Sequence, residues 1–137
     1  MSKVIPQISK YMTAMPHTIG VEQSLKVAKD LMQKHGIRHL PVKSGGKLVG
    51  LVTERDINLL ASFAEVDFSH STVKDAMSTD LFEVEPDTTV DLVAAEMAEK
   101  RIGSALIVQS NGTLVGIFTA IDALQCLAHE FAGRLKK

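Results

Sequence analysis

Two segments of the chain repeat one another at fixed spacing, and this repeat limits the possible folds more than any other feature of the sequence. Residues 48–56 and 114–122 share Leu-Val-Gly, then Thr, then Asp, and residues 8–12 match residues 73–77 upstream. The offset is 65 residues early and 66 late, which predicts a single insertion near residues 102–105. Two copies of this length do not suit an open array of short repeats. We therefore expect a duplicated half-domain, whose copies pack about a pseudo-twofold axis and present equivalent positions to a shared cleft.

Each copy is predicted to contain a strand, a helix, a two-stranded hairpin and a second helix, which makes the fold class α/β (α+β) with two βαββα repeats. In the first copy, Ser24 can cap a helix that Gly36 ends, and Cys126 of the second copy lies in an apolar helical stretch that predicts burial. The other elements expected in the first copy are strands at 17–21, 39–43 and 47–53 and a helix at 55–64. In the second copy we expect a strand at 82–85, a helix that Thr89 caps and that ends at about residue 101, and a hairpin turn at Asn111 and Gly112. Periodicity is lost over residues 65–71, so we expect the first repeat at 1–68 and the second at 69–137.

Composition and charge argue against several classes of function. The chain has 137 residues, 45% of them hydrophobic and 23% charged, as expected for a globular domain with its own core. The net charge of -1, without blocks of like charge, gives no footprint for nucleic acid or an anionic membrane. No secretory signal or membrane-spanning run is apparent, so we expect a cytoplasmic protein.

A Gly-x-x-Thr-x-x-Asp pattern occurs once in each copy. If a strand ends at the Thr and a helix begins there, the Asp lies in the first helical turn, beside unpaired backbone N–H groups. One interpretation is plain capping by the Thr. The duplication favours another, in which the carboxylate accepts two ribose hydroxyls next to a helix N-terminus suited to phosphate. The residues are Gly50, Thr53 and Asp56 in the first copy and Gly116, Thr119 and Asp122 in the second.

Basic residues accompany only the first copy of this pattern. Arg38, His39 and Arg55 could direct two cations and an imidazole toward one phosphate, although a solvated strand edge explains them equally well. The second copy has Gly103, Ser104, Ala120 and Ile121 at the comparable positions, so the two sites are not expected to be equivalent. The histidines lack metal-ligand spacing and there is no nucleophile elbow, so we expect neither a metal site nor an enzyme.

The tandem order of elements, with residues 36–42 and the pattern at 48–56, resembles a CBS domain pair, and the resemblance runs from about residue 5 to residue 128. The resemblance implies a stand-alone regulatory module that binds an adenosyl ligand (AMP, ADP, ATP or S-adenosylmethionine) in one or both of two clefts. Such a module would act on a partner protein in trans. It also implies a disc-like homodimer, for which the C-terminal helix at 121–131 could supply the surface.

The resemblance assigns roles to individual residues. Asp56 and Asp122 would hold ribose hydroxyls, and Thr53 and Thr119 would face the ribose-phosphate. In the first site Arg55, Arg38 and His39 would join them. Purine contacts would come from the opposite repeat: Thr18 and Ile37 for the Asp122 site, and Val84, Ile102 and Gly103 for the Asp56 site. The alternative is a structural homodimerisation module whose nucleotide clefts are vestigial.

Overall fold

The N-terminal segment of the chain folds with the second set of strands and helices rather than with the residues that follow it. The computed structural model describes residues 4–63 and 65–135. Ile8 N–H donates to Thr88 O at 2.7 Å, and Val90 N–H donates to Pro6 O at 2.9 Å. The compact units are accordingly Pro16–Leu81 and the combination of Met1–Met15 with Phe82–Lys137. The predicted boundaries at 1–68 and 69–137 concern the sequence repeats, which are not the same as these compact units. Those boundaries stay a prediction.

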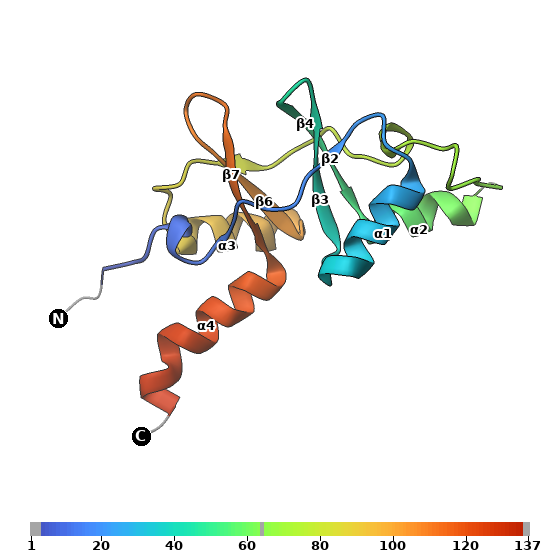
Figure 1. Ribbon diagram of the computed structural model, residues 1–137. Helices are drawn as coiled ribbons and strands as arrows, with labels where there is room; N and C mark the ends of the chain where they lie inside the picture. The colour runs from blue at the N-terminus through green and yellow to red at the C-terminus, as the bar shows by residue number, and fades with distance from the viewer. Residues whose placement is uncertain (1–3, 64, 136–137) are drawn as a thin grey trace. The chain divides into compact units, whose positions relative to one another are not determined.

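The Pro16–Leu81 unit is an α/β unit built on a sheet in the order β2-β3-β4 (Figure 1). β2 runs parallel to β3, and β3 runs antiparallel to β4 through the predicted hairpin. A short 3-10 helix, η2, closes the unit, and its first residue, Val73, donates its N–H to Gln23 O at 2.8 Å. The elements are β2 (Ile19–Gly20), α1 (Leu25–His35), β3 (His39–Ser44), β4 (Lys47–Thr53), α2 (Glu54–Phe63) and η2 (Val73–Asp75).

Local signals explain where α1 begins and ends. The Ser24 Oγ accepts a hydrogen bond from Val27 N–H at 3.2 Å, which satisfies one of the unpaired donors of the first turn. Gly36 ends the helix at a φ of 64°, a left-handed conformation that glycine adopts without steric cost. Both predictions are confirmed. The apolar positions between them face the core of the unit, where Leu25, Ala28 and Met32 pack with Leu40, Val52 and Ile57.

The second unit has a sheet in the order β1-β7-β6-β5. β1 is supplied by the N-terminal segment and pairs antiparallel with β7. Cys126 is buried in the core of this unit, as predicted, and desolvation raises the pKa of its thiol. The elements are η1 (Ile8–Lys10), β1 (Thr13–Ala14), β5 (Glu83–Val84), α3 (Val90–Lys100), β6 (Ser104–Val108), β7 (Leu114–Thr119) and α4 (Ala120–Leu135).

The hairpin registers locate the extra residue of the second copy. Val42 pairs with Gly50 in one unit, and Ile107 pairs with Gly116 in the other. The offset between copies is therefore still 65 at Ile107 and already 66 at Gly116. The prediction of an insertion near residues 102–105 is wrong, and the extra residue lies in the β6–β7 turn. An exposed turn accommodates an added residue without shifting a strand register, whereas the segment entering β6 does not.

The glycine of each Leu-Val-Gly motif makes room for the methionine that belongs to the other copy of the repeat. A Cβ added at Gly50 would lie 2.7 Å from Met77 Sδ and 3.0 Å from Ser78 O. The corresponding Cβ at Gly116 would overlap the sulfur of Met12. The two matches that revealed the repeat, the glycine and the methionine, are thus two halves of one packing contact.

Candidate functional site

Thr53 and Asp56 lie where β4 passes directly into α2. Thr53 Oγ1 accepts a hydrogen bond from Asp56 N–H at 3.0 Å, so the capping interpretation of the threonine is correct. Capping by Thr53 uses the Asp56 N–H and gives no role to the Asp56 carboxylate. Within the part of the chain that the structure describes, the half-buried Asp56 carboxylate accepts no hydrogen bond. An ionised carboxylate in the first turn of a helix can therefore still accept hydroxyl donors from a ligand.

Two of the predicted basic residues flank this junction. His39 is the register partner of Thr53 in the β3–β4 pair, and Arg38 O accepts the Glu54 N–H at 3.0 Å. Arg38 Nε lies 4.0 Å from Glu54 Oε1, in an exposed pair of the kind that contributes little to stability. Arg55 is exposed in the first turn of α2. The fold thus brings Arg38, His39 and Thr53 together at one end of the hairpin, next to the turn that carries Arg55 and Asp56.

The equivalent junction between β7 and α4 repeats a backbone hydrogen bond of the first, but its aspartate carboxylate accepts hydrogen bonds. Ala120 N–H donates to Gly103 O at 3.2 Å, which repeats the backbone bond between Glu54 and Arg38. Here, however, the Asp122 carboxylate accepts from Thr119 N–H at 2.9 Å and from Thr119 Oγ1 at 3.2 Å. Thr13 Oγ1, on the N-terminal segment, lies 3.3 Å and 3.4 Å from its two oxygens. The Asp122 carboxylate is engaged within its own unit.

The residues predicted to contact a purine lie in a strand or within two residues before one. Thr18 directly precedes β2, and Ile37 lies two residues before the start of β3. Both are half-buried and both belong to the Pro16–Leu81 unit. The others are in the second unit, with Val84 in β5 and Ile102 and Gly103 between α3 and β6. Their assignment to the acid of the opposite repeat stays a prediction.

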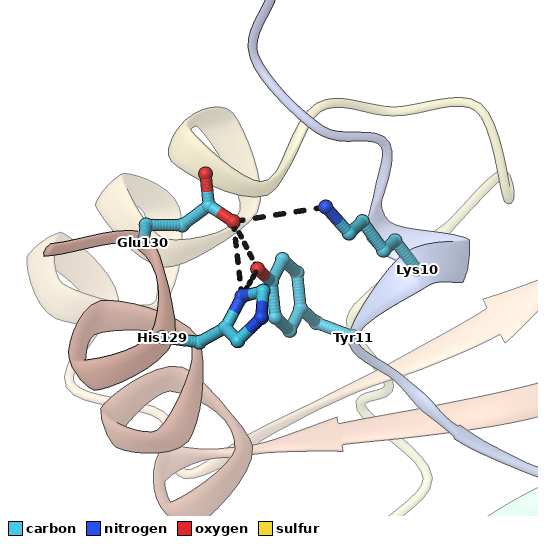
Figure 2. A network of polar contacts seen from close by, with 4 residues as sticks. All are labelled: Lys10, Tyr11, His129 and Glu130. Carbon is cyan, nitrogen blue, oxygen red and sulfur yellow. Dashed lines mark hydrogen bonds and ion pairs between the residues drawn. The ribbon is translucent and has the colours of Figure 1, made fainter. Parts of the chain in front are cut away.

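A polar cluster that sequence reasoning missed joins η1 to α4 (Figure 2). The Tyr11 hydroxyl donates to a carboxylate oxygen of Glu130 and lies 2.5 Å from His129 Nδ1, while Lys10 Nζ is 3.7 Å from the same carboxylate. Desolvation and the bond to Glu130 raise the pKa of Tyr11 to about 12, and the tyrosine hydroxyl in turn lowers the pKa of Glu130. No local motif signals contacts between residues so far apart in sequence.

We also examined the described residues for a metal site, a membrane-spanning helix and a cavity. Among residues 4–63 and 65–135 no group of three or more His, Cys, Asp or Glu side chains is arranged to hold a metal ion. None of the helices in those ranges has the length and apolar character needed to cross a bilayer. A cavity of about 510 Å³ in the Pro16–Leu81 unit is lined by residues of mixed charge, which include Glu54 but not Asp56. The lining residues are Lys26, Lys29, Asp30, Met32, Gln33, Glu54 and Phe68.

Comparison with known proteins decides the family. The model of the CBS domain matches this chain twice, at residues 8–60 and 73–129. The chain belongs to the CBS domain family. Its two matches form a CBS domain pair, as the sequence resemblance implied, and the α/β fold is that of CBS pairs of known structure.

Similar proteins include both an enzyme and small CBS proteins. The chain is 36% identical over 134 residues to inosine-5'-monophosphate dehydrogenase of Korarchaeum cryptofilum, covering 98% of this chain and 27% of that protein. It thus spans about a quarter of the dehydrogenase and matches a CBS region of a larger enzyme. It is 32% identical over 123 residues to the CBS domain-containing protein YhcV of Bacillus subtilis, covering 89% of this chain and 86% of YhcV.

A solved CBS pair connects the fold to adenosyl ligands. The CBS domain pair of protein MJ0100, in complex with 5-methylthioadenosine and S-adenosyl-L-methionine, superimposes with a TM-score of 0.81 at 26% identity. The match covers 93% of this chain and 99% of that one. CBS pairs of this kind are generally regulatory rather than catalytic.

Proposed function

We propose that this CBS pair is a cytoplasmic regulatory module that binds an adenine nucleotide through Asp56 and acts on a partner protein in trans. The observation that supports the proposal most directly is the half-buried Asp56 carboxylate, which accepts no hydrogen bond from the described residues at the start of α2. The adenosyl ligands of the MJ0100 pair support the same class of ligand.

Charge favours a ligand that carries phosphate. The dipole of α2 attracts an anion to the turn that contains Asp56. Arg38 and Arg55 add two cations nearby, of which Arg38 is partly balanced by Glu54. AMP, ADP and ATP supply both the ribose hydroxyls and the anion, whereas 5-methylthioadenosine supplies only the hydroxyls. We therefore expect nucleotides to bind the Asp56 site more tightly than adenosyl thioethers do.

Isothermal titration of ATP, AMP and S-adenosylmethionine into the parent chain and into Asp56→Asn tests the proposal. The amide keeps the size of the side chain but replaces one charged acceptor, and a hydrogen bond to a charged group contributes about 1.5–3 kcal/mol. We expect affinity at this site to fall roughly tenfold to a hundredfold, with the melting temperature of the unliganded chain unchanged. Nucleotide binding that is as tight in Asp56→Asn as in the parent would refute the site.

A second function, homodimerisation with vestigial clefts, is favoured by one face of α4. Ile121, Leu124, Leu127 and Phe131 are exposed to 62%, 60%, 55% and 40%, and their spacing places them along one side of the helix. Exposed apolar stripes of this kind commonly mark interfaces. Sizing the chain in solution with and without ATP separates the two functions. A stable dimer that binds no nucleotide would support the structural role and count against the sensor.

A further inference from the structure

One of the groups that engage Asp122, and that Asp56 lacks, comes from the N-terminal segment. Thr13 Oγ1 donates to the Asp122 carboxylate, at 3.3 Å from one oxygen and 3.4 Å from the other. Those oxygens are the atoms that a ribose would use. A ligand at Asp122 must therefore displace a hydroxyl that the protein itself supplies, in addition to the hydroxyl of Thr119.

The matching residue of the other unit is Ser78, and it does not do this. Ser78 forms an isolated bridge with Leu51, just as Thr13 pairs with Ile117, so the two backbones have equivalent places beside their sheets. The Ser78 Oγ instead accepts a hydrogen bond from Asp80 N–H at 3.3 Å. Within the described residues it makes no hydrogen bond to Asp56. The side chain at this position therefore contributes to the difference between the sites, together with the two bonds that Asp122 accepts from Thr119.

The segment that carries Thr13 is fixed to α4 at two places. Thr13 meets the first turn of α4 at Asp122, and the Tyr11 hydroxyl donates to Glu130 eight residues further along, about 12 Å at the usual helical rise. The backbone pairing of β1 with β7 holds the segment between them. The Thr13 hydroxyl is therefore held beside the Asp122 carboxylate at a high effective concentration. It can compete with the hydroxyls of a ligand for that carboxylate.

We propose that Thr13 determines the order in which the two sites fill, by competing with the ligand's ribose hydroxyls for Asp122. This inference rests on the proposed function. It predicts that the Asp56 site binds its nucleotide first, and that the Asp122 site binds more weakly for as long as Thr13 holds the carboxylate.

Titration of ATP and AMP in an Asp56→Ala background isolates the Asp122 site. In that background Thr13→Val removes the hydroxyl while keeping the shape of a β-branched residue suited to a strand. We expect affinity at the Asp122 site to rise roughly threefold to tenfold, as the loss of one competing hydrogen bond allows. Thr13→Ser, which restores the hydroxyl, should return affinity toward that of the background. The matched control is Ser78→Ala with Asp122→Ala, in which affinity at the Asp56 site should not change.

The outcomes separate this inference from the function on which it rests. Unchanged or weaker binding in Asp56→Ala with Thr13→Val, in a chain whose parent binds nucleotide, overturns the role of Thr13 alone. Absence of binding in the parent and in every variant overturns the proposed function and the role of Thr13 with it. Circular dichroism verifies that each variant is folded, and Thr13→Ala provides a second deletion of the hydroxyl if the valine perturbs β1.

Discussion

Replacing Gly50 by alanine tests the packing contact that defines the repeat. The new methyl group would lie 2.7 Å from Met77 Sδ and 3.0 Å from Ser78 O. The sulfur is at the flexible end of its side chain, but the carbonyl accepts the Leu51 N–H at 2.9 Å and cannot withdraw without lengthening that bond. Overpacking of this kind costs about 1–3 kcal/mol, and the lower entropy of the unfolded alanine chain recovers about 0.4–1 kcal/mol. From the middle of each range, we expect a net loss of about 1.3 kcal/mol.

Gly116→Ala is the matched comparison, because the three atoms nearest to its added methyl group all belong to the side chain of Met12 and none to the backbone. A methionine side chain can change rotamer, so the loss should be smaller than at Gly50. Urea unfolding followed by far-ultraviolet circular dichroism measures both losses. In thermal unfolding, the melting temperature of Gly50→Ala should lie roughly 3–8 °C below that of the parent. A Gly50→Ala chain as stable as the parent, or a larger loss at Gly116, would refute the argument that the backbone of Ser78 sets the cost.

Two further predictions concern α4. The pKa of Tyr11 is raised from 10.0 to about 12, so its contribution to stability is complete below pH 10 and is lost as the pH rises through about 12. Tyr11 is the sole tyrosine of the sequence, so tyrosinate absorbance reports its titration directly, and Tyr11→Phe should remove this alkaline loss in urea unfolding. A Tyr11 pKa near 10 would contradict the contact with Glu130. Leu124→Glu places a charge on the exposed apolar stripe of α4 and should convert a dimer to monomer in analytical ultracentrifugation; a dimer that persists does not use this face.

Elements whose signals are local could be predicted from the sequence. Ser24 and Gly36 bound α1 as expected, and Asn111 and Gly112 lie in the turn between β6 and β7, where the Asn111 side chain accepts the Thr113 N–H at 3.0 Å. Capping and turn formation depend on residues within about four positions, which a sequence displays directly. The motif at Asp56 was found for the same reason.

The partnership of the N-terminal segment could not be predicted in this way. The match of residues 8–12 with residues 73–77 establishes that the two segments are equivalent, and it invites the assumption that each begins its own repeat. The structure instead pairs β1 with β7, across about a hundred residues of sequence. Equivalence within a repeat says nothing about which copy a segment packs against, because that choice is made by long-range hydrogen bonds and core contacts. The bond from Tyr11 to Glu130 escaped prediction for the same reason.

The same long-range pairing explains why a duplicated motif need not give duplicated sites. Thr53 and Thr119 cap equivalent turns, and Asp56 and Asp122 occupy equivalent positions, yet only Asp122 is engaged by hydroxyl groups. One of these hydroxyl groups belongs to Thr13, which is more than a hundred positions away from the acid that it contacts. A pair of copies that differ in one such residue offers a ligand two carboxylates of unequal availability, and so can respond to concentration in two steps. Exchanging the hydroxyl between copies, with Thr13→Val and Ser78→Thr in one chain, should narrow the difference in affinity between the sites if the side chain at this position controls it. If the difference persists, the basic residues Arg38 and Arg55 of the first copy account for it instead.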